Sequence, residues 1–190
     1  MSVGRGTITH VSDVTEVQRL QALLDASFAK ASRHLTSIMS EQRRLAADRL
    51  LAELPCPAVL NIATVTARGE PRISAVDGHF IHGHWYFTTD RASPKARQLL
   101  ARPAISASFT PRDGFGVFCH GRVADLESGP ERQLVIDHFI QTYGESPEAW
   151  GDILFARIDA DWMVGFAMTP EEEKEMAEQQ AERQARRAGS

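Results

Sequence analysis

Three short apolar runs joined by tight turns occupy the middle of the chain, and they restrict the fold more than any other feature. Each run is rich in β-branched, aromatic or small apolar residues, which is typical of strands. The turns, Ala67-Arg68-Gly69-Glu70 and His82-Gly83, are too short for anything but antiparallel neighbours. The sequence therefore predicts an antiparallel meander with strands over residues 58–67, 71–81 and 84–89.

Three further strand-like segments follow a predicted helix that begins at Ser93-Pro94 and ends before Pro103. Another helix is predicted over residues 129–143. Within the strand-like segment before it, Gly121 indicates a bend or a close backbone approach. Six short strands with one crossover helix between the third and fourth predict a mainly β, α+β fold, a six-stranded antiparallel split β-barrel. The last three strands are expected over residues 104–110, 116–127 and 153–168.

Helical patterns flank the predicted barrel on both sides. Apolar positions recur at helical spacing from Asp13 to Ala31, and a second helix is expected from Ser40 until the Pro55-Cys56-Pro57 break. The segment after Thr169 begins with acidic residues and has few apolar ones, as expected for a solvated helix. The predicted organisation is an N-terminal helical extension, a split-barrel domain and a solvated C-terminal helix, over residues 1–55, 56–168 and 169–190.

Charge and hydropathy exclude several classes of protein. The net charge of -4 argues against a nucleic-acid-binding surface, which needs a basic stripe. No run reaches the roughly 18 to 20 apolar residues that cross a bilayer, and Met1–Gly6 lacks the apolar core of a signal peptide. We therefore expect a cytoplasmic protein without a membrane partner. Cys56 and Cys119 lack the spacing of a zinc site or a disulfide framework, so both are expected reduced and Cys119 is expected in the core.

The junction between the third strand and the first barrel helix has the composition of a phosphate site. Ser93 is a good N-cap, Pro94 suits the first helical position, and Lys95 and Arg97 add positive charge. The first-turn N–H groups are expected to point outward, unpaired, toward an anion. Hydroxyls at the strand end are expected to donate to the same phosphate, and they belong to Thr88 and Thr89. An ordinary capped helix with solvated basic residues fits this segment equally well.

Two stretches of this region resemble the pyridoxamine phosphate oxidase-like, flavin-binding split-barrel family. They are Pro71-Arg72-Ile73-Ser74 and the segment 87–99, Phe-Thr-Thr-Asp-Arg-Ala-Ser-Pro-Lys-Ala-Arg-Gln-Leu. Gly121-Arg122-Val123 is similar to a later strand of the family, and Trp162-Met163-Val164-Gly165-Phe166 is similar to its closing segment. The resemblance covers about residues 57 to 166.

The resemblance implies a cofactor with a phosphate group, either FMN or the deazaflavin coenzyme F420. It also implies a homodimer in which the cofactor lies at the subunit interface. Together with the positive charge of the first helical turn, it assigns the cofactor-binding role to Arg72, Ser74, Thr88, Thr89, Ser93, Lys95 and Arg97.

The chemistry implied is transfer of a hydride or electrons to or from a small conjugated or heteroaromatic substrate. Such chemistry belongs to the cofactor, so no catalytic side chain is expected. The substrate-side candidates are His120, Arg122 and Trp162, although His120 and Arg122 fit a solvated strand face equally well. Pro94 stands where the oxidases often carry Arg, and their C-terminal Arg-x-His pattern is absent, which argues against pyridoxamine phosphate oxidase activity itself.

A non-catalytic flavin or haem carrier on the same barrel is the alternative function. In that case His120 or a hairpin histidine is the expected haem ligand. The hairpin histidines alternate without a carboxylate or cysteine partner in sequence, so no metal site is expected there. We expect them to be exposed turn residues, at positions His79, His82 and His84.

Overall fold

The computed structural model describes residues 14–188. Residues 1–13 lie outside the described residues, as do residues 189 and 190. The expectations for Met1–Gly6 and for a helix start at Asp13 fall in that part of the chain. Within residues 14–188, no helix has both the length and the apolar character needed to cross a bilayer.

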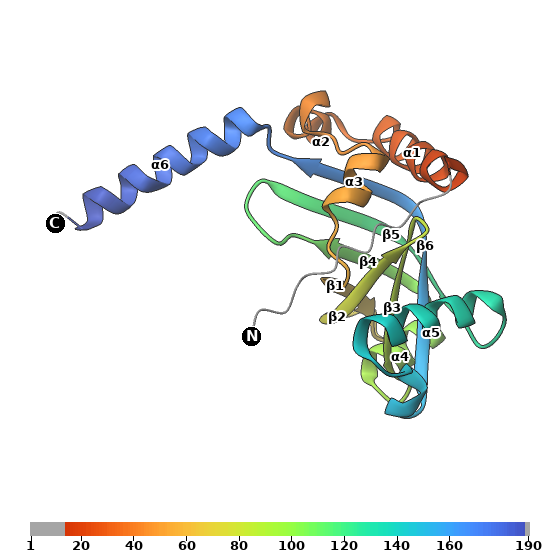
Figure 1. The fold of residues 1–190 in the computed structure, drawn as a ribbon. Coiled ribbons are helices and arrows are strands. Elements are labelled where there is room, and N and C mark those ends of the chain that lie inside the picture. The colour runs from red at the N-terminus through yellow and green to blue at the C-terminus, as the bar shows by residue number, and fades with distance from the viewer. Residues whose placement is uncertain (1–13, 189–190) are drawn as a thin grey trace.

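Six strands form a closed barrel in which every neighbouring pair is antiparallel. Their order around the barrel is β1-β2-β3-β6-β5-β4, so the first three strands form the predicted meander (Figure 1). The predicted six-stranded antiparallel barrel is thus confirmed. The strands are β1 (Ala58–Val65), β2 (Pro71–Ile81), β3 (His84–Asp90), β4 (Ala104–Phe109), β5 (Phe115–Asp125) and β6 (Ile153–Ala167).

The barrel is split between the first half of β2 and the second half of β3. β2 pairs with β1 along Pro71–Gly78, but its pairing with β3 covers only His79–Ile81 against His84–Tyr86. Beyond the hairpin, β3 pairs with β6 on its other edge as far as Asp90. The start of β2 and the end of β3 therefore diverge, which leaves both of these segments with a free edge toward each other.

The core inside the barrel follows the alternation of the strands. Leu60 and Ile62 of β1 and Trp85 and Phe87 of β3 are fully buried there. Cys119 of β5 also lies in this core, as predicted. Successive side chains of a strand point to opposite faces, so every second residue of each strand faces the interior of the barrel.

Gly121 marks the point where β5 and β6 lose register. The pairing shifts between His120 and Gly121, and a Cβ atom at Gly121 would lie 2.1 Å from the carbonyl oxygen of Asp159. No side chain fits at that distance, so the predicted close backbone approach is confirmed.

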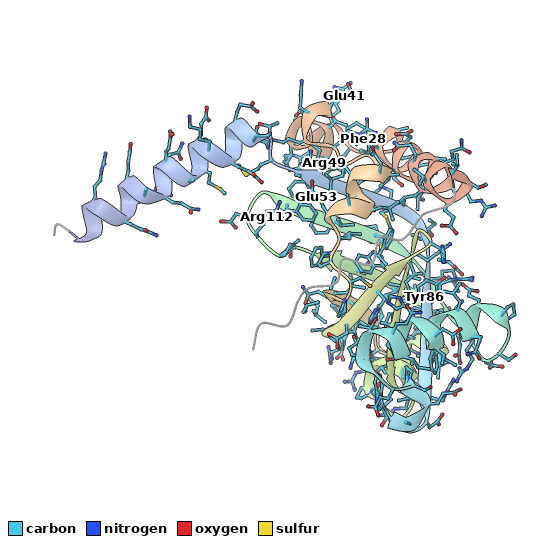
Figure 2. The ribbon with its side chains drawn as sticks, viewed as in Figure 1. Phe28, Glu41, Arg49, Glu53, Tyr86 and Arg112 are labelled. Atoms are coloured by element: carbon cyan, nitrogen blue, oxygen red, sulfur yellow. The ribbon has the colours of Figure 1, made fainter. Side chains whose placement is uncertain are left out.

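Two helices connect the strands at one end of the barrel. Helix α4 (Pro94–Ala101) links β3 to β4, and α5 (Pro130–Tyr143), followed by the short 3-10 helix η2 (Pro147–Trp150), links β5 to β6. α5 covers the outer face of the barrel and forms a second apolar core with it. Tyr86 of β3 lies in that core beneath α5 (Figure 2) and donates a hydrogen bond to Glu131 at 2.8 Å.

The N-terminal segment contains four helical pieces in place of the two predicted helices. The helix expected from Ser40 begins at Ala47, because Arg44 is extended, with ψ of 134°, and bridges Phe166 of β6. The N–H of Leu45 donates to the carbonyl of Gly165 at 2.9 Å, so pairing with the barrel replaces helical hydrogen bonds here. The pieces are α1 (Val14–Ala29), α2 (Arg33–Ile38), η1 (Glu41–Arg43) and α3 (Ala47–Glu53).

Helices α1 and α3 lie over β6 and share the core of the barrel (Figure 1). Leu20, Leu24 and Leu50 pack into the same apolar cluster as Met163. The hydroxyl of Ser27 accepts a hydrogen bond from the backbone N–H of Met163 at 2.9 Å. At the other end of the chain, α6 (Pro170–Ala188) projects away from the barrel (Figure 1).

Candidate functional site

The junction between β3 and α4 is a capped helix start, as the sequence indicates. Ser93 is extended, with φ of -64° and ψ of 151°, and its hydroxyl accepts a hydrogen bond from the Ala96 N–H at 3.2 Å. The same hydroxyl lies 3.2 Å from that of Thr89 at the end of β3. The structure therefore joins Thr89 and Ser93 in one hydrogen-bonded pair at the helix N-terminus.

The backbone donors of this first turn are less available than the sequence suggests. The Ala96 N–H is bonded to the Ser93 side chain, and the Arg97 N–H donates to the Ser93 carbonyl at 3.1 Å. Pro94 has no N–H. Among the described residues, only the Lys95 amide of this turn is left for an anion. The expectation of several unpaired first-turn amides is wrong, because the cap itself satisfies two of them, and side chains must provide most of the contacts to a phosphate.

One face of α4 lies against the end of β1. Gln98 accepts a hydrogen bond from the Thr64 hydroxyl at 2.5 Å, and Arg102 donates to the Val65 carbonyl at 3.0 Å. Residues three or four apart share a helix face, so Lys95 begins the same row as Gln98 and Arg102. No hydrogen bond or ion pair within the described part of the chain occupies the Lys95 ammonium group.

Strand register places Arg72 and Ser74 beside the end of β1, which is the end that α4 contacts. Arg72 is paired with Thr64, and Ser74 with Ile62, so both belong to the inner face of β2. Arg72 now donates to Glu70 at 2.8 Å and to the Pro71 carbonyl at 2.9 Å. An anionic phosphate would compete with Glu70 for this guanidinium group. A phosphate would find positive charge and hydroxyl donors here, but it would have to replace Glu70 at Arg72.

The remaining predicted residues of this site are placed differently. Consecutive strand residues face opposite sides, so Thr88 shares the outer face with Tyr86 while Thr89 faces the interior with Phe87. Arg97 is exposed and donates to the Ala92 carbonyl at 2.8 Å. Thr89 is therefore the strand hydroxyl that the structure links to the helix cap. We call the inner-face strand residues Arg72, Ser74 and Thr89, together with Ser93 and Lys95 at the start of α4, the cradle.

The predicted substrate-side residues lie on the outer face of the barrel. His120 stacks on Trp162 with ring centroids 4.7 Å apart and bonds the Ser106 hydroxyl at 2.9 Å. Ser106 is paired with Ala63 of β1, and Ala63 is paired with Ile73 of β2, so this row of outward-facing residues continues across the sheet to Ile73. Ile73 lies between Arg72 and Ser74 in the sequence but faces the opposite side. Arg122 is exposed on the same face. Within one chain, the structure does not bring these residues together with the cradle.

Two well-formed cavities of the described residues lie away from the cradle. One, of about 340 Å³, lies beside the paired Arg91 and Asp125 and is lined by Arg91, Arg132 and Phe155. The other, of about 500 Å³, lies beside α5 and is lined by Ile81, Leu134 and His138. Neither of these two cavities is lined by a cradle residue.

The hairpin histidines do not share one environment, and the prediction for His79 is wrong. His82 and His84 are at the turn and partly exposed, as expected. His79 is completely buried, because α5 covers the part of β2 that carries it. The sequence gives no sign of this cover, since α5 begins about fifty residues later.

Comparisons with known proteins identify the family. The family model described as pyridoxamine 5'-phosphate oxidase matches residues 46–177, which include all six strands and the cradle. Two curated relatives, both the large subunit of exodeoxyribonuclease 7, are local matches. The one from Geotalea daltonii is 33% identical over 41% of this chain, and the chain spans only 17% of its length. The chain spans only 13% of the length of the relative from Geotalea uraniireducens.

Solved structures of low sequence identity share the fold. A conserved hypothetical protein from Mycobacterium tuberculosis has a TM-score of 0.55 at 18% identity, covering 67% of this chain and 88% of that one. An FAD-binding protein from Mesorhizobium loti has a TM-score of 0.52 at 20% identity, covering 67% and 97%. A haem storage protein from Vibrio cholerae has a TM-score of 0.50 at 16% identity, covering 70% and 94%. The chain thus belongs to the pyridoxamine 5'-phosphate oxidase-like family of FMN-binding split barrels.

Proposed function

We propose that this protein is an oxidoreductase that binds FMN, or alternatively coenzyme F420, and acts on a small conjugated or heteroaromatic substrate. The observation that supports the proposal is the hydrogen-bonded Thr89–Ser93 pair at the start of α4, beside Lys95, with Arg72 and Ser74 on the start of β2 across the split of the barrel. The family model extends over all of these residues. Because FMN and coenzyme F420 both carry a phosphate, the cradle does not separate them.

The cradle residues have distinct roles in this proposal. Lys95 supplies a charge-assisted hydrogen bond, since its ammonium group has no partner among the described residues. The Thr89–Ser93 pair supplies one free hydroxyl donor, because one of the two hydroxyls donates to the other across 3.2 Å. Arg72 releases Glu70 and turns its guanidinium group to the phosphate. Arg97 and Thr88, at the margin of the cradle, contribute charge and a hydroxyl group from further away.

The protein side chains position and enclose rather than react. The bound cofactor supplies hydride or single-electron transfer, and the chain holds its phosphate and orients its ring. No residue of the cradle is needed as an acid or a base. The substrate-side role stays with His120, Arg122 and Trp162, whose stacked rings and positive charge suit a planar or anionic substrate.

A second copy of the chain completes the site in this proposal. The outer face of β1 and β2 carries large exposed apolar side chains, with Ile73 77% and Val59 62% exposed. Both side chains lie on the same face of the β1–β2 ladder, and exposed apolar surface is a common feature of protein interfaces. A homodimer that buries this face would bring the partner's outer surface next to the cradle.

The dimer is tested by light scattering of the purified protein, with Ile73→Asp as the variant. We expect a dimer for the natural chain, and a monomer with weakened FMN binding for Ile73→Asp. Asp113→Asn, on the turn after β4, is the control and should stay dimeric. A monomeric natural chain that still binds FMN would contradict the interface.

The function is tested by the absorption spectrum of the purified protein, followed by titration with FMN, coenzyme F420 and haem. A bound flavin or deazaflavin that is reduced and then reoxidised by a heteroaromatic acceptor supports the proposal. A bound flavin that never turns over indicates the carrier alternative. A haem Soret band that is lost in His120→Ala indicates the haem alternative. Absence of any cofactor binding would overturn both.

A further inference from the structure

A cysteine and two histidines from three separate segments converge on the outer face of β2, away from the cradle. Cys56 lies just before β1, His79 is on β2 and His138 is on α5. The Cys56 Sγ atom is 3.5 Å from Nδ1 of His79 and 3.4 Å from Nε2 of His138, and these two nitrogens are 3.0 Å apart. All three potential ligand atoms point to one spot.

The spacing of these atoms suits one metal ion. Zn²⁺ binds thiolate sulfur at about 2.3 Å and imidazole nitrogen at about 2.0 to 2.1 Å in a tetrahedron. In that geometry two nitrogens are about 3.3 Å apart, and sulfur and nitrogen are about 3.6 Å apart. The separations in the protein are within a few tenths of an ångström of these values. Only small side-chain rotations are needed for bonds to an ion.

Both imidazoles are buried, and burial keeps the His79 ring in the neutral form that binds metals. His79 is 0% exposed and His138 is 6% exposed. Burial, together with His138, lowers the pKa of His79 to about 3, so its ring is neutral at neutral pH. Burial also raises the pKa of the Cys56 thiol, which a divalent cation would reverse by binding the thiolate. Cys56 remains exposed on its other side, so an ion has a path from solvent.

Tyr143 provides the outer partner that a ligating histidine needs. Its hydroxyl oxygen is 3.0 Å from Nε2 of His79, the nitrogen on the far side of the ring from the cluster. If Nδ1 binds a metal, Nε2 carries the hydrogen and donates it to Tyr143, which fixes the tautomer and the ring orientation. The ring of Phe139 packs on His79 with centroids 4.2 Å apart and holds it from the side.

We propose that Cys56, His79 and His138 form a Zn²⁺ site, with Tyr143 as the positioning residue and water as the fourth ligand. Thiolate and imidazole favour zinc over calcium or magnesium, which take oxygen ligands. The ion would tie the segment before β1 to α5 across the outer face of β2. Without metal, the same groups form a hydrogen-bonded network in which Tyr143 and His138 contact opposite nitrogens of His79 and the Cys56 thiol contacts both imidazoles.

The site is tested on the full-length chain by competition of Zn²⁺ with a chromophoric chelator and by Co²⁺ absorption. We expect one ion per chain and a thiolate-to-cobalt charge-transfer band. Cys56→Ser and His138→Gln should lower Zn²⁺ affinity by more than about a hundredfold, beyond the effect of losing an outer partner. Tyr143→Phe should lower it by about ten- to hundredfold.

Matched controls separate this site from other thiols and imidazoles. Cys119→Ala and His84→Gln should leave Zn²⁺ affinity and the cobalt spectrum unchanged. In the natural chain, Zn²⁺ should also slow alkylation of Cys56, a measurement that does not depend on any variant folding. The proposal is overturned if the folded natural chain binds no Zn²⁺, if binding survives both Cys56→Ser and His138→Gln, or if Cys56 alkylation is unaffected by Zn²⁺.

Discussion

The two faces of β2 carry opposite kinds of chemistry. The inner face contributes Arg72 and Ser74 to the cradle, where cationic and hydroxyl groups are accessible to solvent. The outer face contributes His79 to a buried cluster of neutral, soft groups under α5. Because strand residues alternate between faces, a single strand supports both sites without contact between them. Changes to one face should therefore leave the other site intact.

The largest expected effect comes from loosening α5 over the outer face. Phe139 is 1% exposed and packs on His79, so Phe139→Ala should lower the free energy of unfolding by about 3 to 5 kcal/mol. Urea unfolding measures the loss, and Ile140→Ala, at a 41% exposed position of the same helix, is the control. In the protein that remains folded, Zn²⁺ affinity should fall while FMN affinity changes by less than about twofold. A parallel loss of FMN affinity would show that the two faces are coupled.

The corresponding change on the inner face is Lys95→Ala. Loss of a charge-assisted hydrogen bond should weaken FMN binding by about 1.5 to 3 kcal/mol. Fluorescence titration with FMN measures this change, with Lys174→Ala on α6 as the control for loss of a surface lysine. Zn²⁺ binding should be the same in both variants. Unchanged FMN affinity in Lys95→Ala would remove the cradle as the phosphate site.

The outer face should also respond to pH in a way that the inner face does not. Burial and His138 lower the pKa of His79 to about 3 in the folded protein, below the value of about 6.5 for an unfolded histidine. Between these two pKa values His79 is protonated in the unfolded chain but neutral in the folded protein. The free energy of unfolding therefore falls as the pH falls below about 6.5, by up to about 1.4 kcal/mol per pH unit, until about pH 3. Cys56, His138 and Tyr143 face this ring.

Urea unfolding of the metal-free protein between pH 7 and pH 5 measures this slope, with the range chosen to span the unfolded histidine pKa. His79→Gln should flatten it, whereas His84→Gln should keep it. Equal slopes in the natural chain and His79→Gln would mean that His79 is not held neutral by the fold.

The smallest predicted effect compares two serine caps. Ser93→Ala removes the cap of α4, and Ser32→Ala removes that of α2, where the Leu35 N–H donates to Ser32 at 3.2 Å. Each change should lower the free energy of unfolding by about 1 kcal/mol. Only Ser93→Ala should also weaken FMN binding, because only that hydroxyl belongs to the cradle. Similar FMN affinity in both variants would limit Ser93 to a structural role.

The sequence indicated the cradle residues but not the cluster of Cys56, His79 and His138, because the members of that cluster are far apart along the chain. Thr89, Ser93 and Lys95 lie within one strand-to-helix junction, so local cap and turn chemistry indicates them directly. Cys56 and His79 are 23 residues apart, and His79 and His138 are 59 apart. Only the packing of α5 on β2 brings them together, and no local pattern encodes that packing.

The barrel was predictable because the alternation of apolar residues and the turn residues are both visible in short stretches of sequence. Gly121 was identified as a close backbone approach in the same way, as a glycine inside a strand pattern. The helix expected from Ser40 was not, because Arg44 and Leu45 follow helical propensity in isolation but pair with β6 in the fold. The unpaired amides expected at α4 were lost to the cap of Ser93, whose hydroxyl and carbonyl bond two of them. Tertiary pairing and side-chain caps overrode local expectation in these two places.

The most direct test of the cradle compares FMN with riboflavin, which has the same ring but no phosphate. Both dissociation constants are measured for the natural chain and for Lys95→Ala at one ionic strength. The account predicts that the natural chain prefers FMN by at least about tenfold, the equivalent of one charge-assisted hydrogen bond, and that Lys95→Ala loses most of this preference. Equal affinity of the natural chain for FMN and riboflavin would contradict it.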